Sequence, residues 1–272
     1  MSKLSKPIGV FDSGVGGLSV LRHLVRILPN EQYVYLGDTA RVPYGNKSEE
    51  TIQEYTRQAV KFLLQIEAKL IIIACNTASA LALQIAEELS DIPIIGMIHP
   101  AAKAAAISTK NGKIGIIGTR ATIGSKAYPQ VISQFQSNKT FEVYGKACPL
   151  LVPLAEEGFH EHVSTELIIQ EYLTSLQSED IDTLVLGCTH YPLLAPLIQK
   201  QMPNATLIDC GEYAAFEAQT ILSLSNRINS IEHIITPTKI DFYLTDSTPL
   251  FPEIAERFLG FLIESPTRIN LE

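Results

Sequence analysis

Residues 69–80 read KLIIIACNTASA, a buried-strand pattern that changes abruptly into a helix-capping pattern. The five residues before Cys75 are apolar and mostly β-branched, which is typical of a strand covered on both faces. Asn76 and Thr77 then supply side chains that cap helix N-termini, and the following pattern predicts a helix to about Leu89. The stretch therefore predicts an α/β unit with a cysteine at the joint between strand and helix.

Cys75 lies where open α/β sheets bind their ligands, at the carboxyl end of a strand. Unpaired N–H groups and the dipole of the helix N-terminus favour a thiolate over a thiol at this place. The alternative is a buried structural cysteine, because free cysteine is among the most buried residue types. One cysteine alone does not decide between these interpretations.

A second copy of the pattern lies farther along the chain. Residues 184–194 read LVLGCTHYPLL, an apolar strand that ends at Cys188, 113 residues after Cys75. A weaker similarity pairs residues 8–14, IGVFDSG, with residues 114–120, IGIIGTR, 106 residues later. The two similar spacings predict two related α/β halves, each with one cysteine at the same structural place, and favour a functional pair.

Composition narrows the class of protein. The chain has 272 residues, 46% of them hydrophobic, which allows one large domain or two of ordinary size. A net charge of −8 without a Lys/Arg cluster argues against nucleic acid, and no apolar run reaches the roughly 18 residues of a membrane span. The residues before the first strand are too few for a signal peptide. Four cysteines without C-x-x-C spacing fit a reducing cytoplasm, with Cys148 and Cys210 interpreted as packing residues.

Strand and helix patterns alternate along the chain, which indicates parallel strands joined by right-handed crossovers. Strands are predicted near residues 8–12, 33–37, 70–74, 94–97, 113–118, 141–145, 183–187, 207–209 and 239–245. Among the helices we expect segments near 122–135, 164–177 and 211–229, and a last one opened by Ser247.

No Gly/Pro/Ser-rich linker marks a boundary between the two halves. We place the crossings near residues 98 and 209. The first domain then comprises residues 1–98 plus 210–272, and the second comprises residues 99–209. The expected architecture is two similar parallel-sheet α/β domains, the first of them discontinuous.

The glycine-rich run at residues 12–17, DSGVGG, resembles a phosphate loop but lacks the Gly-Lys-Ser/Thr of a P-loop. It matches the dinucleotide fingerprint only at the first two glycines, although Asp38 stands about where a ribose-binding acid would. A carboxylate at Asp12 would repel a pyrophosphate, which argues against a nucleotide. The alternative is that the loop N–H groups hold a small carboxylate, with Asp12 and Ser13 facing the cleft.

Patterns for other catalytic classes are weak. Cys188 and His190 with the distant Cys75 and Asp12 offer ligand types for zinc, but one C-x-H is a weak metal pattern. Residues 160–162, HEH, are typical of a solvated turn. No G-x-S-x-G is present, so a serine hydrolase has no support.

Two thiols facing each other across a cleft suit the inversion of a carbon stereocentre. One group must remove a proton from one face, and another must return a proton to the opposite face. Since a thiol pKa lies near 8.5, a helix dipole and an acidic or imidazole neighbour can poise one thiolate and one thiol. Asp12 and His190 are the expected neighbours of Cys75 and Cys188, one on each side.

Four segments of the chain are distinctive: residues 11–19 (FDSGVGGLS), 37–45 (GDTARVPYG), 74–78 (ACNTA) and 186–192 (LGCTHYP). In these segments the chain resembles the glutamate racemases, of the cofactor-independent aspartate/glutamate racemase superfamily. The segments are specific in combination, and the likeness extends from the first strand to about residue 220.

The resemblance implies two α/β domains related by a pseudo-twofold axis, with the active site in the cleft between them and neither cofactor nor metal. It implies that Cys75 acts on D-glutamate and Cys188 on L-glutamate, and that Asp12 and His190 assist them and contact the substrate. The other implied substrate-binding positions are Ser13, Tyr44, Gly45, Asn76, Thr77, Thr119, Thr122, Glu156 and Thr189. The implied role is the supply of D-glutamate for the peptidoglycan of the bacterial cell wall.

Two features depart from the resemblance. His99 follows the fourth strand where an uncharged residue is expected, and is interpreted as a solvated loop residue or a change to the rim of the site. The chain also lacks the long N-terminal extension of members that a cell-wall precursor activates, which favours a constitutively active homodimer. Two other functions stay open: racemisation of aspartate or another dicarboxylate, and a nucleotide- or carboxylate-binding module with structural cysteines.

Overall fold

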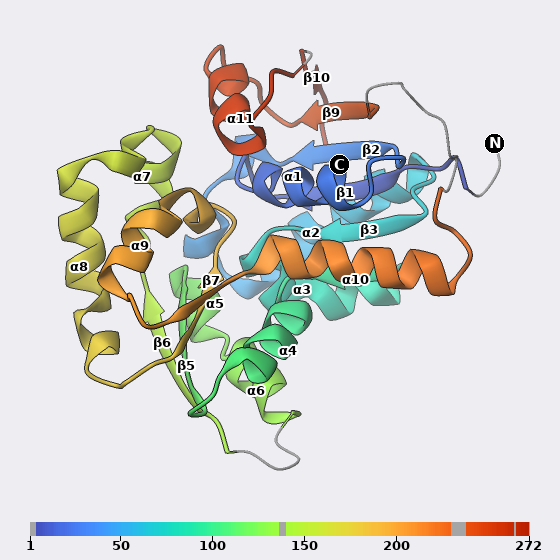
Figure 1. The fold of residues 1–272 in the computed structure, drawn as a ribbon. Helices are drawn as coiled ribbons and strands as arrows, with labels where there is room; N and C mark the ends of the chain where they lie inside the picture. Colours follow the sequence, from blue (N-terminus) through green and yellow to red (C-terminus); the bar gives the residue numbers. More distant parts are fainter. Residues whose placement is uncertain (1–3, 136–139, 230–237, 264, 272) are drawn as a thin grey trace.

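The computed structural model describes residues 4–135, 140–229, 238–263 and 265–271. In these ranges the chain forms two parallel sheets that stand side by side, each surrounded by helices (Figure 1). The predicted class, two parallel-sheet α/β units, is confirmed.

The first sheet has the strand order β10-β9-β2-β1-β3-β4, and every pair in it is parallel. Its strands are β1 (Ile8–Asp12), β2 (Tyr33–Gly37), β3 (Leu70–Ile73), β4 (Ile94–Gly96), β9 (Ile240–Leu244) and β10 (Thr267–Arg268). The strands β1, β2 and β3 are buried along their whole length because helices cover both faces of this sheet.

The second sheet has the order β6-β5-β7-β8 and is also parallel throughout. Its strands are β5 (Lys113–Gly118), β6 (Glu142–Ala147), β7 (Thr183–Gly187) and β8 (Thr206–Asp209). The order matches that of β2-β1-β3-β4 strand for strand, so β3 and β7 occupy equivalent places. Cys75 follows β3 after Ala74, and Cys188 follows β7 directly, which is why the sequence repeats itself around the two cysteines.

The helices of the described ranges fall into two groups. Those around the first sheet are α1 (Leu18–Ile27), α2 (Glu49–Gln65), α3 (Asn76–Glu88), α10 (Cys210–Leu224) and α11 (Phe251–Leu259). Those around the second are α4 (Ile98–Ser108), α5 (Arg120–Gly124), α6 (Ala127–Ser133), α7 (Leu151–Glu156), α8 (Val163–Gln177) and α9 (Ala195–Gln201). None of the helices in the described ranges is both long and apolar enough to span a membrane.

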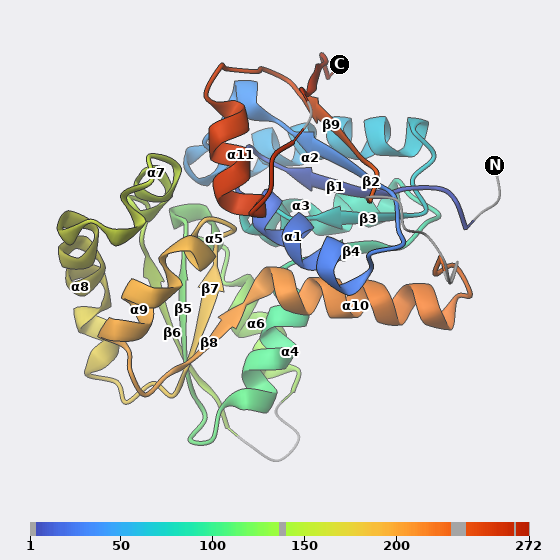
Figure 2. The same cartoon turned by 45° about the horizontal axis from the view of Figure 1, so that its top comes forward.

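One hydrophobic core joins the two halves. It runs from the α1 face of the first sheet to the face of the second sheet that α4 and α6 cover. Helix α10 lies along this junction and contacts both α1 and α4 (Figure 2). Separate cores fill the far faces, under α2 and α3 in the first half and under α8 and α9 in the second.

The pairing of β9 with β2 brings residues 240–244 back to the first sheet, while residues 113–209 supply the whole second sheet. We therefore propose the division into residues 1–98 plus 210–272 and residues 99–209.

Several local predictions were wrong. The helix expected at 122–135 is two helices, because Lys126 has a left-handed backbone (φ 57°) between α5 and α6. The helix expected at 211–229 ends at Leu224, and the last helix begins at Phe251 rather than just after Ser247. The strand β10 was not predicted, and it is only two residues long. Helix α7 was not predicted either, because its six residues are too few for a clear period.

His99 was expected in a loop, and that placement is wrong. It lies in the first turn of α4, with its side chain 51% exposed and its Nδ1 atom 3.6 Å from a carboxylate oxygen of Glu217 on α10. It does not line the pocket described below. The interpretation that His99 alters the rim of the site is therefore also wrong.

Candidate active site

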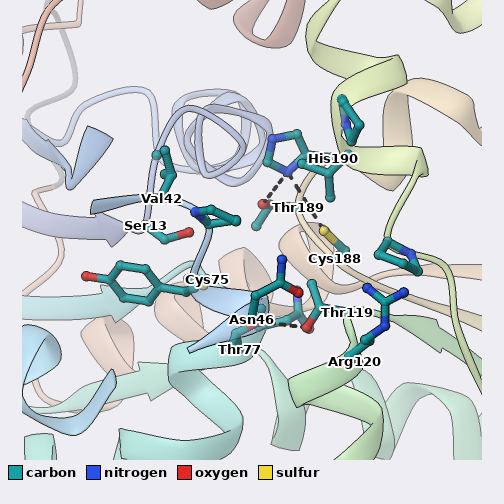
Figure 3. Close-up of a pocket in the computed structure, with 18 of the residues that line it drawn as sticks. Ser13, Val42, Asn46, Cys75, Thr77, Thr119, Arg120, Cys188, Thr189 and His190 are labelled. Atoms are coloured by element: carbon teal, nitrogen blue, oxygen red, sulfur yellow. Dashed lines mark hydrogen bonds between the residues drawn. The ribbon is translucent and has the colours of Figure 1, made fainter. Parts of the chain in front are cut away.

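A pocket of about 590 Å³ lies between the two sheets, lined by segments that follow the carboxyl ends of β1, β2, β3, β5, β6 and β7 (Figure 3). This is the edge at which parallel α/β sheets bind ligands. The structure brings together eleven of the residues predicted for the site: Ser13, Tyr44, Gly45, Cys75, Asn76, Thr77, Thr119, Glu156, Cys188, Thr189 and His190. Cys75 and Cys188 enter this single pocket from different sheets.

The surroundings of Cys75 keep it protonated. Its side chain is buried, and burial together with the neighbouring Asp12 carboxylate raises the pKa of the Cys75 thiol to about 12, against hydrogen bonds from Ser13 and the Ala78 N–H. Asp12 is fully buried at the end of β1, and its Oδ2 accepts a hydrogen bond from the Gly14 N–H at 2.9 Å. At neutral pH Cys75 is therefore a thiol, ready to act as an acid. The thiolate expected here from the helix N-terminus is wrong, because burial and Asp12 outweigh the hydrogen bonds that favour it.

An imidazole that is itself paired with a carboxylate lies beside Cys188. The Nδ1 atom of His190 lies 3.8 Å from Cys188 Sγ (Figure 3). Its Nε2 atom lies 2.8 Å from a carboxylate oxygen of Glu156. Burial alone would lower the pKa of His190, but the hydrogen bonds and charges of Cys188 and Glu156 raise it to about 10. A cationic imidazole at neutral pH stabilises a thiolate beside it.

The glycine-rich run after β1 packs against the turn that follows β7. A Cβ atom at Gly16 would lie 2.2 Å from Thr189 Oγ1 and 2.4 Å from a ring carbon of His190, so only glycine fits there. The Ser19 hydroxyl donates to the carbonyl oxygens of Gly16 and Thr189, both at 2.8 Å. The run thus holds the two halves together at the site, which explains its glycines without a phosphate.

Three hydroxyl groups form a bridge between the halves on another wall of the pocket. Thr77 Oγ1 lies 2.9 Å from Thr119 Oγ1 and 3.3 Å from Thr122 Oγ1, and the last two are 2.9 Å apart. Thr119 also caps α5, since its hydroxyl accepts from the Thr122 N–H. Each hydroxyl can turn toward a ligand or toward its neighbour, so this wall can donate to and accept from a polar substrate.

A buried carboxylate shapes the loop after β2. Asp38 accepts hydrogen bonds from the hydroxyl groups of Tyr44 and Thr245 and from Nε of Arg41. These contacts fix the loop that carries Tyr44 and Gly45 into the pocket. Asp38 therefore organises the site from below and does not act as a ribose-binding acid.

Asn76 lines the pocket and uses only one of its two side-chain polar groups for hydrogen bonds within the described residues. Its Oδ1 accepts a hydrogen bond from the Tyr128 hydroxyl at 2.7 Å, whereas its buried Nδ2 has no partner among the described residues. A buried N–H group without a partner is costly, so a ligand acceptor at this position would be stabilised.

Two predicted residues do not line the pocket themselves. Asp12 lies beneath it, and Thr122 reaches it only through Thr77 and Thr119. The lining residues that sequence analysis missed are Gly14, Val42, Pro43, Asn46, Arg120, Pro149, Leu150, Val152, Pro153 and Tyr172. Of these, Arg120 directly follows the predicted Thr119, so its position next to a strand end was a usable signal.

The remaining candidates lie elsewhere. Cys148 and Cys210 are buried and do not line the pocket, and the Cys210 thiol donates to the Leu186 carbonyl oxygen at 3.2 Å. His162 caps α8, because its Nδ1 accepts from the Ser164 N–H. Within the described ranges, no group of three or more His, Cys, Asp or Glu side chains is close enough to hold a metal ion.

The family model for Asp/Glu/hydantoin racemases matches residues 8–218 of the chain. The chain belongs to this racemase family. A glutamate racemase from Chlorobaculum parvum is 47% identical over 256 residues, which cover 93% of this chain and 92% of the relative. Among the racemase structures, that of glutamate racemase from Francisella tularensis in complex with D-glutamate has a TM-score of 0.91 at 39% identity, with 98% of each chain covered.

A glutamate racemase isoform from Bacillus anthracis gives a TM-score of 0.92 at 40% identity, again over 98% of both chains. The fold of the chain is thus shared, over 98% of its length, with both of these solved glutamate racemases.

Proposed function

We propose that this member of the racemase family interconverts L- and D-glutamate by acid/base catalysis at Cys75 and Cys188, without a cofactor. The placement of the two cysteines carries the proposal. Each follows the equivalent strand of its sheet, and both reach one pocket from different halves of the molecule. The relatives named as glutamate racemases, at 41–47% identity, support glutamate over aspartate as the substrate.

The unequal surroundings of the two thiols assign their roles in the free enzyme. With L-glutamate bound, the Cys188 thiolate takes the proton from Cα, and the electron pair left on Cα takes a proton from the Cys75 thiol on the opposite face. The C–H bond that breaks and the one that forms involve the same carbon, so D-glutamate leaves Cys188 protonated and Cys75 as a thiolate. The reverse reaction uses the same steps in the opposite order.

His190 and Asp12 assist from opposite sides. The imidazolium of His190 stabilises the Cys188 thiolate, and Glu156 keeps that imidazole charged. The negative charge of Asp12 raises the pKa of Cys75, so the Cys75 thiol keeps its proton until the carbanion forms at Cα. In the free enzyme Cys75 therefore carries a proton and Cys188 does not, as racemisation of L-glutamate requires.

The polar groups of the pocket fit a dicarboxylate amino acid. The unpartnered Nδ2 of Asn76 and the hydroxyls of Thr77 and Thr119 are fixed donors for carboxylate oxygens. Arg120 adds one exposed cation at the rim. We assign substrate binding to these groups together with the predicted positions Ser13, Tyr44, Gly45, Glu156, Thr189 and His190. The predicted Asp12 and Thr122 do not line the pocket and support its lining residues from behind.

We further propose that the protein acts in the cytoplasm as a homodimer and supplies D-glutamate for peptidoglycan. The names of the relatives support the metabolic role. Size-exclusion chromatography with light scattering checks the dimer, and a D-glutamate requirement in cells depleted of the protein checks the role.

The decisive experiment uses deuterated water. The purified enzyme is incubated with L-glutamate, and separately with L-aspartate, with no added cofactor. Newly formed D-glutamate should carry deuterium at Cα from the earliest turnovers, while unreacted L-glutamate should gain much less. The reason is that the returning proton comes from the second thiol, which has already exchanged with solvent.

Aspartate should react far more slowly. One methylene group is worth only about 1–3 kcal/mol, but a carboxylate site left unpaired costs more. Rapid deuteration of L-glutamate without D-glutamate would reject two opposed thiols. Faster turnover of aspartate would reject the substrate assignment.

A further inference from the structure

The C-terminal helix α11 contacts the acid/base residues of the other half. It packs on α1, at the side of the first sheet that faces α7 (Figures 1 and 2). Two consecutive side chains on it, Arg257 and Phe258, each reach one member of the Glu156–His190 pair. We call these two residues the α11 clamp.

Arg257 completes the end of α7. The carbonyl groups in the last turn of a helix lack partners within the helix, and a nearby cation can satisfy them. The Nη1 of Arg257 donates to the carbonyl oxygen of Glu156, the last residue of α7. Since the same residue carries the carboxylate that bonds His190, Arg257 fixes the backbone from which that carboxylate extends.

Gly158 leaves room for this contact. Its backbone is left-handed (φ 77°), which only glycine adopts without cost, and it turns the chain sharply after α7. A Cβ atom at Gly158 would lie 2.9 Å from Cζ of Arg257. The turn therefore admits the guanidinium group as well as reversing the chain.

Phe258 packs on the other member of the pair. Its ring is fully buried and stands at 85° to the His190 ring, with 5.3 Å between the ring centroids. This contact restricts rotation of the imidazole. The ring is thereby kept with Nδ1 toward Cys188 and Nε2 toward Glu156.

We propose that the α11 clamp is a positioning device that holds Glu156 and His190 in line with Cys188. Its consequence for catalysis depends on the proposed racemase function, whereas its effect on the Glu156–His190 pair does not. The titratable groups that face His190 are Cys188, Glu156 and Asp12. Neither clamp residue lines the pocket, so they act through the pair.

The test follows the ring signals of His190 by NMR as a function of pH, assigned by their loss in His190→Gln. In the wild type His190 should stay protonated until the pH nears 10. Arg257→Ala and Phe258→Leu should each lower this midpoint by about one pH unit, because a looser Glu156–His190 bond favours the cation less. Arg257→Lys keeps a charged donor and should recover part of the shift.

Two matched variants separate the clamp from general effects. Glu253→Ala removes the other partner of Arg257, a carboxylate 3.2 Å away, and should leave the midpoint unchanged. Arg57→Ala removes a similar ion pair on α2 and should also leave it unchanged. Wild-type midpoints in both Arg257→Ala and Phe258→Leu would overturn the proposal, and if Arg257→Ala does not fold, Phe258→Leu and Arg257→Lys decide it.

Kinetics add the catalytic consequence. With glutamate, Arg257→Ala and Phe258→Leu should lower kcat about 10-fold and change KM less, because neither clamp residue lines the pocket. An enzyme that does not racemise glutamate but shows the shifted midpoint would reject the proposed function and keep the clamp. Normal kcat with an unshifted midpoint would reject the clamp and keep the function.

Discussion

Cys75 and Cys188 occupy equivalent places in two sheets of the same strand order, yet the charges around them are opposite. Burial and the neighbouring Asp12 carboxylate raise the pKa of Cys75 and keep its sulfur protonated, against a hydrogen bond from Ser13. Around Cys188 lies an imidazole that Glu156 keeps charged, which favours a thiolate. The two halves thus share the same strand order but differ in the charges around their cysteines. This difference suits a reaction that needs an acid on one face of a carbon atom and a base on the other.

One physical constraint limits how the difference can be observed. L- and D-glutamate have equal free energies in water, so kcat/KM must be the same in both directions for every variant. The asymmetry between the two sides must therefore appear in exchange reactions, in pKa values, or in kcat and KM taken separately. The following predictions use those quantities.

The largest effect is expected from removing either thiol. Cys75→Ala and Cys188→Ala should each lower racemisation by at least about 1,000-fold, because each removes one proton-transfer group. Cys188→Ala retains Cys75 and should exchange the Cα hydrogen of D-glutamate alone, whereas Cys75→Ala should exchange that of L-glutamate alone. Polarimetry and proton NMR in deuterated water measure both.

Cys148→Ala and Cys210→Ala are the matched controls and should racemise at close to the wild-type rate, since neither side chain lines the pocket. Normal turnover by either Cys75→Ala or Cys188→Ala would end the two-thiol mechanism. If each variant exchanges the Cα hydrogen of the other enantiomer instead, the roles assigned to Cys75 and Cys188 are reversed.

Asp12→Asn should make the two sides more alike. Without the like charge nearby, the pKa of Cys75 should fall from its value of about 12, and racemisation should fall about 10- to 100-fold. The pH dependence of alkylation at Cys75, followed by mass spectrometry of the peptide, measures the first effect. Asp182→Asn is the control, because Asp182 also accepts backbone N–H groups but lies away from the pocket. An unchanged alkylation profile in Asp12→Asn would contradict the role given to that carboxylate.

Glu156→Gln should weaken the support for a charged His190 beside Cys188. The folded-state pKa of His190, about 10, lies above its ordinary 6.5, so its charge stabilises the fold below pH 6.5, and this contribution is lost as the pH rises to 10. The free energy of unfolding should therefore fall less steeply over this interval in Glu156→Gln than in the wild type, and kcat should drop about 10-fold. Urea unfolding across the interval measures the slope. Glu157→Gln, an exposed neighbour, should behave as wild type, and equal slopes in all three proteins would show that Glu156 does not hold the charge.

The smallest effect concerns the wall that the two halves share. Thr77→Val removes one hydroxyl from the group of three and should raise KM about 3-fold with kcat nearly unchanged, since one neutral hydrogen bond is lost. Thr165→Val, a buried threonine on α8 outside the pocket, is the control. A large loss of kcat in Thr77→Val would move this hydroxyl into the chemistry of the reaction.

The sequence predicts the elements that bear the cysteines because local patterns determine them. The apolar run before Cys75 needs burial on both faces, and Pro192 and the polar residues after each strand mark where the chain turns. Equivalent patterns around Cys188 then predict that both thiols lie at the same edge of their sheets. Most of the predicted site residues were found by their position after a strand end or by the family resemblance.

What sequence analysis missed depends on contacts between distant segments. Arg257 lies on an amphipathic helix whose pattern predicts only a buried face, and nothing local connects it with Glu156. Asn46 and Val42 enter the pocket because Asp38 and Thr245 hold their loop in place. His99 was misplaced because the alanine-rich helix that contains it begins directly after β4, without a capping side chain to mark it.

Because both thiols are buried, the thiol that carries the proton after a turnover should depend on which enantiomer was the last substrate. Cys75 and Cys188 are each only 6% exposed, so exchange of their protons with solvent should be slow. In the proposed mechanism, an enzyme that has just released D-glutamate still has the proton on Cys188, and in that state it binds D-glutamate productively but not L-glutamate. Until exchange with water restores the starting protonation state, the enzyme accepts only the enantiomer that it last released. At high concentrations of one enantiomer this resetting, rather than any step at carbon, should set the pace of turnover.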